Sequence, residues 1–106
     1  MISDFNFLGF SPDQNLERKA NLAVERLLDL APHGSMAVAL LEKENASFRC
    51  AIEIYSKQGP FIARGCADTA ESALEAVVRS LSKKLDRWRG RREVHRVLKT
   101  QQRVPA

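Results

Sequence analysis

Basic residues are concentrated near one end of this 106-residue chain, in an arrangement that suits phosphate binding. Ten of the seventeen Lys and Arg residues lie between Arg79 and Arg103, where only Asp86 and Glu93 are acidic, so this segment carries a formal charge of +8. The remaining residues carry a formal charge of −4. A positive surface on a rigid element is suited to a polyanion, because each neutralised phosphate releases counterions.

The spacing of these bases places many of them on one helix. Arg79, Lys83 and Arg87 are four residues apart and would share a face. Bases late in a helix also complement its dipole, but that needs only one or two in the last turn, and seven lie between Arg79 and Arg92. The residues expected to contact RNA phosphates are first Lys83, Lys84, Arg87 and Arg91, then Arg79, Arg89 and Arg26, with Arg92 widening the surface.

No other chemistry is indicated by the sequence. His33 and His95 are isolated from each other, and the two cysteines do not have the spacing of a zinc site. No Gly-rich phosphate loop follows a predicted strand, so we expect a binding protein without a cofactor, a metal or a small-molecule substrate, and not an enzyme. Cys50 and Cys66 are expected to be small apolar strand residues. Trp88 is expected to pack on the core rather than to stack on a base.

Two helices are predicted from apolar residues that recur at intervals of three and four. The first should run from about Pro12 to Leu30, and the second should begin near Asp68 and weaken or bend at Gly90. Two sequence pairs have the spacing of capping boxes, with Ser11 and Asp68 as the N-caps: Ser11 with Gln14, and Asp68 with Glu71. Short apolar or alternating segments predict strands at residues 4–10, 36–41, 48–55 and 61–66, with turns at residues 42–45 and 58–60.

This order predicts an α+β fold: a four-stranded mixed β-sheet with two helices packed on one face, in the order β-α-β-β-β-α. The first two strands should be parallel if adjacent, because a helix connects them. The uncovered sheet face would carry Arg49, Glu53 and Tyr55 toward water. Residues 1–92 are expected to form the RNA-binding domain, and residues 93–106 a basic tail that is partly disordered or extends the helix, loose from Thr100 onward. No apolar run is long enough to cross a bilayer and the N-terminus does not look like an export signal, so we expect a cytoplasmic protein.

In these elements the chain resembles the short form of the ribosome hibernation promoting factors, also described as ribosome-associated inhibitors or sigma-54 modulation proteins. The resemblance covers about Phe5 to Arg92 and is clearest from Ala63 to Arg89, where a small residue, a Gly, an acidic helix start, an apolar repeat and a basic half follow the family's order. Ala23 and Ser80 stand where the family frequently has lysine. The matching positions are Leu16, Ala20, Val24, Arg26 and Leu27 in the first helix, and Leu74, Val77, Leu81, Lys83, Lys84, Leu85 and Arg87 in the second.

The resemblance implies the same fold and binding to the small ribosomal subunit in the channel used by messenger and transfer RNA, which blocks translation in stressed or resting cells. Long family members add a second domain that pairs ribosomes, so we expect this chain to act as a monomer and to occlude ribosomes without pairing them. The alternative is a protein-interaction regulator that binds an acidic protein through the same helix or through the open sheet face.

Overall fold

The structure, a computed structural model, describes the backbone of residues 3–103 and the side chains of residues 5–90. Within these residues the strands lie side by side in chain order, with β1 parallel to β2 and the other neighbours antiparallel. The predicted mixed four-stranded sheet is therefore confirmed, including its parallel pair. The elements are β1 (Ser3–Leu8), α1 (Gln14–Leu30), β2 (Met36–Glu44), β3 (Ser47–Ser56), β4 (Gly59–Ala67) and α2 (Ala70–Arg103).

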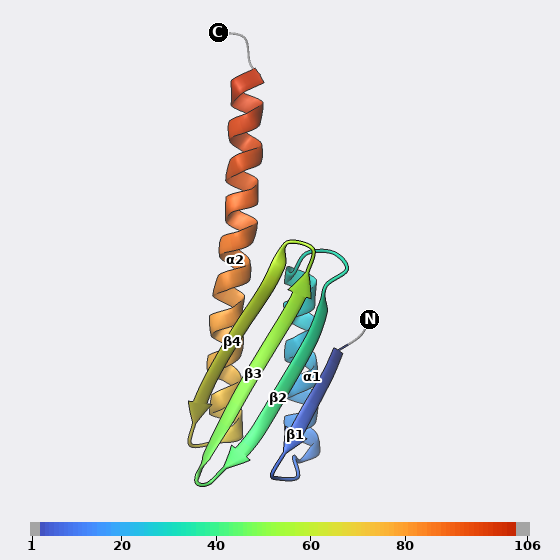
Figure 1. Cartoon of the computed structure of the whole chain (residues 1–106), viewed down its shortest axis with the longest axis vertical. Helices are drawn as coiled ribbons and strands as arrows, with labels where there is room; N and C mark the ends of the chain where they lie inside the picture. Colours follow the sequence, from blue (N-terminus) through green and yellow to red (C-terminus); the bar gives the residue numbers. More distant parts are fainter. Residues whose placement is uncertain (1–2, 104–106) are drawn as a thin grey trace.

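Both helices cover the same face of the sheet (Figure 1). α1 packs mainly against β1 and β2, and α2 packs mainly against β4 and β3. α1 follows β1 and α2 follows β4, and these two strands point in the same direction. Each helix returns antiparallel to the strand before it, so α1 and α2 run side by side in the same direction. The opposite face of the sheet is covered by no element in the described part of the chain.

The N-caps differ from the predicted ones. Asp13, not Ser11, caps α1: its backbone is extended and its carboxylate accepts a hydrogen bond from the Leu16 amide at 2.7 Å. Thr69, not Asp68, caps α2, because its hydroxyl oxygen accepts from the Ser72 amide at 3.1 Å. Both capping boxes were therefore wrong. In each case another capping residue lay one or two positions further along and satisfies a free amide of the first turn.

α2 is longer than predicted. It continues through Gly90 and reaches Arg103, and Figure 1 shows it extending beyond the end of the sheet. Gly90, expected to weaken or bend the helix, does not end it, and of the two forms expected for the tail the structure has the helical extension as far as Arg103. The loose segment expected from Thr100 is therefore wrong as far as Arg103, and residues 104–106 lie outside the described residues. A single glycine in an exposed helix costs only about 1 kcal/mol, which neighbouring helix formers can offset.

The hairpin turns are shorter than predicted. β2 and β3 are joined by Asn45 and Ala46 alone, since Glu44 pairs with Ser47. Asn45 adopts a φ of 57°, a conformation that asparagine tolerates in tight turns. Pro60 lies inside β4 rather than in the turn, which is compatible with an edge strand because one side of such a strand has no ladder partner.

The core lies between the sheet and the helices. The predicted helix stripes are confirmed: Val24 and Leu27 of α1 are buried against the inward side chains of the strands, among them Ile52. Each fully buried aliphatic side chain contributes on the order of 1.5–3 kcal/mol. The buried stripe of α2 consists of Ala73, Leu74, Val77, Leu81 and Leu85.

The two cysteines lie on opposite faces of the sheet. Cys50 is in the core, where burial raises the pKa of its thiol to about 12, so it behaves as the small apolar residue that was predicted. Cys66 lies in β4, so its prediction as a strand residue is confirmed, but it is exposed rather than packed in the core. Its strand pairing with Arg49 places it on the uncovered face.

Gly9 provides a test of how closely the chain is packed after β1. Its φ is +79°, and a Cβ there would lie 2.7 Å from the backbone oxygen of Lys43. We expect Gly9→Ala to lower the free energy of unfolding by about 2 kcal/mol or more, because it adds a clash with rigid backbone to the strain of a positive φ. Gly34 also has a positive φ but faces open space, so Gly34→Ala should cost only about 1 kcal/mol. If urea denaturation showed that Gly9→Ala and Gly34→Ala lose the same free energy of unfolding, this account of Gly9 would be contradicted.

Candidate nucleic-acid interface

The helix pair is held together at its N-terminal end by a lysine between two glutamates. Lys19 of α1 donates hydrogen bonds to Glu71 at 2.5 Å and to Glu75 at 2.8 Å, both on α2. These two hydrogen bonds raise the pKa of Lys19 above its usual range, and the bond to Glu71 has the larger effect. The bond from Lys19 is also the main reason that the pKa of Glu75 is lowered, with a smaller contribution from Arg79. The acids that begin α2 are therefore matched within the domain.

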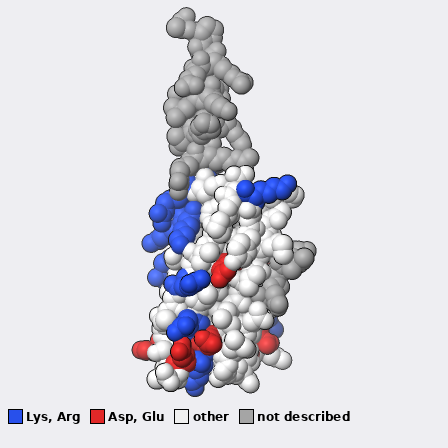
Figure 2. All heavy atoms as spheres, in the orientation of Figure 1, with Lys and Arg blue, Asp and Glu red and all other residues white. Residues whose placement is uncertain are grey.

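The bases further along α2 are not matched in this way. Arg79, Lys83 and Arg87 form a row on the side of α2 opposite its buried stripe. All three are exposed, as is Arg89, and no described carboxylate lies within ion-pair distance of any of them. Figure 2 shows Lys and Arg atoms gathered along the α2 side of the molecule, just below the grey segment. This row is a surface with spare positive charge on a rigid helix.

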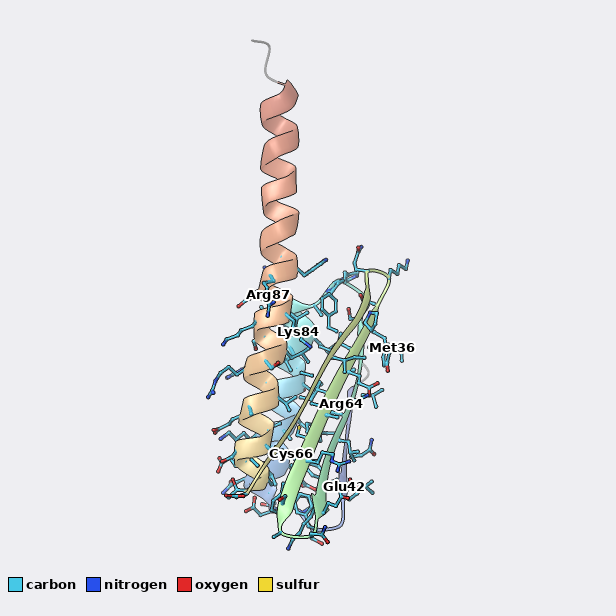
Figure 3. The ribbon with its side chains drawn as sticks, turned by 60° about the vertical axis from the view of Figure 1, so that its left-hand side comes forward. Met36, Glu42, Arg64, Cys66, Lys84 and Arg87 are labelled. Carbon is cyan, nitrogen blue, oxygen red and sulfur yellow. The ribbon has the colours of Figure 1, made fainter. Side chains whose placement is uncertain are left out.

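Lys84 has a different environment from the other predicted bases. Its ammonium donates a hydrogen bond to the backbone oxygen of Ile62 on the edge strand β4. Figure 3 shows Lys84 and Arg87 one turn apart on α2, on the side of the molecule where β4 lies. Lys84 therefore links α2 to the sheet, and of the two it is Arg87 that is without a partner among the described residues.

The remaining predicted bases are distributed over two places. Arg26 is exposed on α1, and it lies across a groove from Arg79 of α2. The side chains of Arg91 and Arg92 lie outside the described side chains, although the helical backbone of α2 includes both positions. The structure thus places the described bases on both helices, along the middle of α2 from Arg79 to Arg89 and at Arg26 of α1, rather than on α2 alone.

The uncovered sheet face has charge of both signs. Arg49 pairs with Glu44 at 2.5 Å, and Arg64 lies 3.7 Å from Glu53. The Tyr55 hydroxyl donates a hydrogen bond to Glu53, which raises the pKa of Tyr55. Figure 2 shows this face as mostly uncharged, with acids and bases mixed at its lower end. It carries no unmatched positive row, so it is a poorer surface for a polyanion than the helices.

The groove between the two helices was not predicted from the sequence. Its floor is apolar and includes Leu22, which is 45% exposed. Leu22, Leu30 and Val78 stand beside the predicted helix stripes rather than within them. These extra apolar residues were a signal that each helix is apolar over a wider arc than the core requires.

The described residues contain no group of three or more His, Cys, Asp or Glu side chains that could hold a metal ion. None of their helices is both long and apolar enough to cross a membrane.

Two solved structures share this fold. The chain is similar to the N-terminal domain of Protein Y from Thermus thermophilus, with a TM-score of 0.71 and 15% identity over 83% of this chain and 99% of that one. It is also similar to a ribosomal subunit interface protein from Coxiella burnetii, with a TM-score of 0.67 and 10% identity over 81% of this chain and 94% of that one. No protein-family model and no curated protein matches the chain. At these identities the likeness establishes the fold, and the fold implied by the resemblance to hibernation promoting factors is confirmed.

Trp88 contacts the core edge, as predicted. Its ring packs edge-to-face against Phe61 of β4 at a centroid distance of 6.0 Å, and it is partly buried. We expect Trp88→Ala to lower the free energy of unfolding by about 2 kcal/mol, less than for a fully buried ring. Binding to RNA below the melting temperature should be unchanged, and Trp88→Phe should recover most of the stability. A stable Trp88→Ala protein with much weaker RNA binding would instead identify a base-stacking residue.

The Lys19 ion pairs predict a particular pH dependence of stability. Because the folded pKa of Glu75 is lowered, its contribution is present above about pH 4.5 and is lost as the pH falls through the folded value. Because the folded pKa of Lys19 is raised, its contribution is present below about pH 10.5 and is lost as the pH rises through the folded value. The stability difference between wild type and Lys19→Met should therefore be greatest between these limits and shrink outside them. Arg18→Met removes the same charge from the same helix and should show no such profile.

Proposed function

We propose that the chain binds the small ribosomal subunit through ribosomal RNA and blocks translation during stress or stationary phase. The observation that carries this proposal is the row of Arg79, Lys83 and Arg87, exposed and without carboxylate partners among the described residues. The fold supports it, since the similar Coxiella burnetii protein is described as a ribosomal subunit interface protein. In this proposal the protein acts in the cytoplasm.

The proposed interaction is electrostatic anchoring followed by steric occlusion. Cations spaced by one helical turn face the same direction and can neutralise successive phosphates of an RNA backbone. A helix packed along the sheet fixes the backbone that carries them, so little backbone ordering is required on binding. A domain anchored in this way excludes other ligands from the surface it covers. No reacting group is needed, so the role is binding rather than catalysis.

The remaining predicted bases have distinct parts in the proposal. Arg89 adds a further exposed base on α2, and Arg26 adds a contact from α1. Arg91 and Arg92 continue the basic sequence along α2, and they stay predictions from the sequence. Lys84 is assigned a secondary contribution, because its ammonium is already bonded to Ile62.

The test is a triple charge reversal that avoids Lys84. Lys83→Glu, Arg87→Glu and Arg89→Glu together should weaken co-sedimentation with purified small subunits by at least about tenfold. Each lost phosphate contact should also flatten the salt dependence by about 0.7–0.9 log units of affinity per log unit of salt. The reversal should leave the helical circular dichroism signal and the core intact, because these side chains are exposed.

The matched control changes the net charge by the same amount away from this row. Lys43→Glu, Lys57→Glu and Arg64→Glu alter exposed residues of β2, the β3–β4 turn and β4. This control should retain co-sedimentation within about threefold, because long-range charge is screened over about 10 Å at 0.1 M salt. Equal losses in the two triple variants would show that net charge, and not this row, determines binding. Binding that survives ribonuclease treatment of the partner would favour an acidic protein instead of RNA.

A further inference from the structure

A groove runs between the two helices on the side away from the sheet. Its volume is about 520 Å³, which lies within the range of ligand-binding pockets. The floor is aliphatic, and Leu22, Leu30 and Val78 contribute to it without being fully buried. Apolar side chains gathered in a groove and rimmed by polar residues form a candidate interaction site.

The charges around the groove are arranged unevenly. At one end Glu75 is bonded to Lys19, so this end is already neutralised. Further along, Arg26 of α1 and Arg79 of α2 both line the groove and are exposed. Neither has an ion-pair partner among the described residues. The groove therefore combines an apolar floor with two arginines, one from each helix, that have no ion-pair partner among the described residues.

We propose that this groove binds an acidic amphipathic protein helix, with aliphatic side chains on the floor and carboxylates paired with Arg26 and Arg79. An amphipathic helix presents apolar residues at i, i+3 or i+4 and i+7, and recognition of such a helix in an apolar groove is a recurring mode. Carboxylates that flank the apolar stripe match the two arginines, which can bind them in a bidentate manner. Arg26 and Arg79 are shared with the proposed RNA surface, whereas the apolar floor at Leu22 is not, so the inference does not depend on RNA binding by Lys83 and Arg87.

The chemistry of the floor favours a protein over a nucleic acid. An unstacked base binds best on an aromatic ring, and no aromatic residue lines this groove. Ser82 is the one uncharged polar residue among the lining residues, which leaves little for recognition of a base edge. Leucine and valine side chains of a partner helix would instead remove the exposed part of Leu22 from water.

The experiment starts from a display library of helical peptides with randomised residues at the apolar and flanking positions, selected against the purified full-length chain. Enriched peptides should converge on apolar residues spaced by three and four with Glu or Asp beside them. Their affinities for the variants are then measured by fluorescence anisotropy. Leu22→Gln should weaken binding about fivefold or more, because burial of its exposed half is lost. Arg26→Gln combined with Arg79→Gln should weaken it further and reduce its salt dependence.

A matched control separates this groove from apolar surface in general. Met36 is 51% exposed on the uncovered sheet face, close to the 45% of Leu22, and Figure 3 shows it on the sheet, well apart from Lys84 and Arg87 of α2. Met36→Gln should leave peptide affinity unchanged, and Leu22→Gln should leave co-sedimentation with small subunits unchanged. A selection that yields no peptide binders, or binders equally sensitive to both substitutions, would overturn the proposal. If an RNA oligonucleotide displaced the selected peptide and Leu22→Gln also lost RNA binding, the proposal of a protein helix would be overturned in favour of RNA.

Discussion

The packing of α2 against β3 and β4 is the constraint on which the other features of this protein depend. Leu74, Val77, Leu81 and Leu85 are at most 1% exposed, so this side of α2 is fully removed from water. Burial on this scale fixes the rotation of the helix about its axis, because turning it would expose several large aliphatic side chains at once. Once the rotation is fixed, the row at Arg79, Lys83 and Arg87 must face solvent. The charge of the surface is thus a consequence of the apolar spacing beneath it.

The same constraint separates the molecule into surfaces of different character. On the sheet face, acids and bases from neighbouring strands lie within reach of one another, as Arg49 and Glu44 do, so its charges cancel locally. On α2 the acids Glu71 and Glu75 precede the row at Arg79, Lys83 and Arg87, and both acids are bonded to Lys19 of α1. Pairing between neighbouring strands brings opposite charges together on the sheet, whereas this order along α2 leaves the row without an ion-pair partner among the described residues. The spare positive charge of the described residues therefore gathers along α2.

Much of the fold was predictable because its signals are periodic. The stripe from Leu74 to Leu85 and the alternation from Phe48 to Tyr55 each repeat several times, and both were assigned correctly. The caps were not, because each depends on one side chain: Asp13 and Ser11 are both good caps, and the backbone conformation decides between them. The partner of Lys84 could not be predicted from the sequence either, because its ammonium bonds to the backbone oxygen of a residue 22 positions away. Predicting the groove would have required the distance between the two helices, which no local sequence pattern contains.

The observed length of α2 changes the interpretation of its bases. A helix ending near Arg92 would place Arg89, Arg91 and Arg92 in the last turn, where complementing the dipole would account for one or two of these bases. Because α2 continues to Arg103, these residues lie well inside the helix, and the dipole effect is confined to the terminal turn. Inside a helix, like charges four residues apart destabilise it by about 0.2–0.5 kcal/mol per pair. The row at Arg79, Lys83 and Arg87 therefore carries a small electrostatic cost within the helix, which under the proposed function a bound polyanion would compensate.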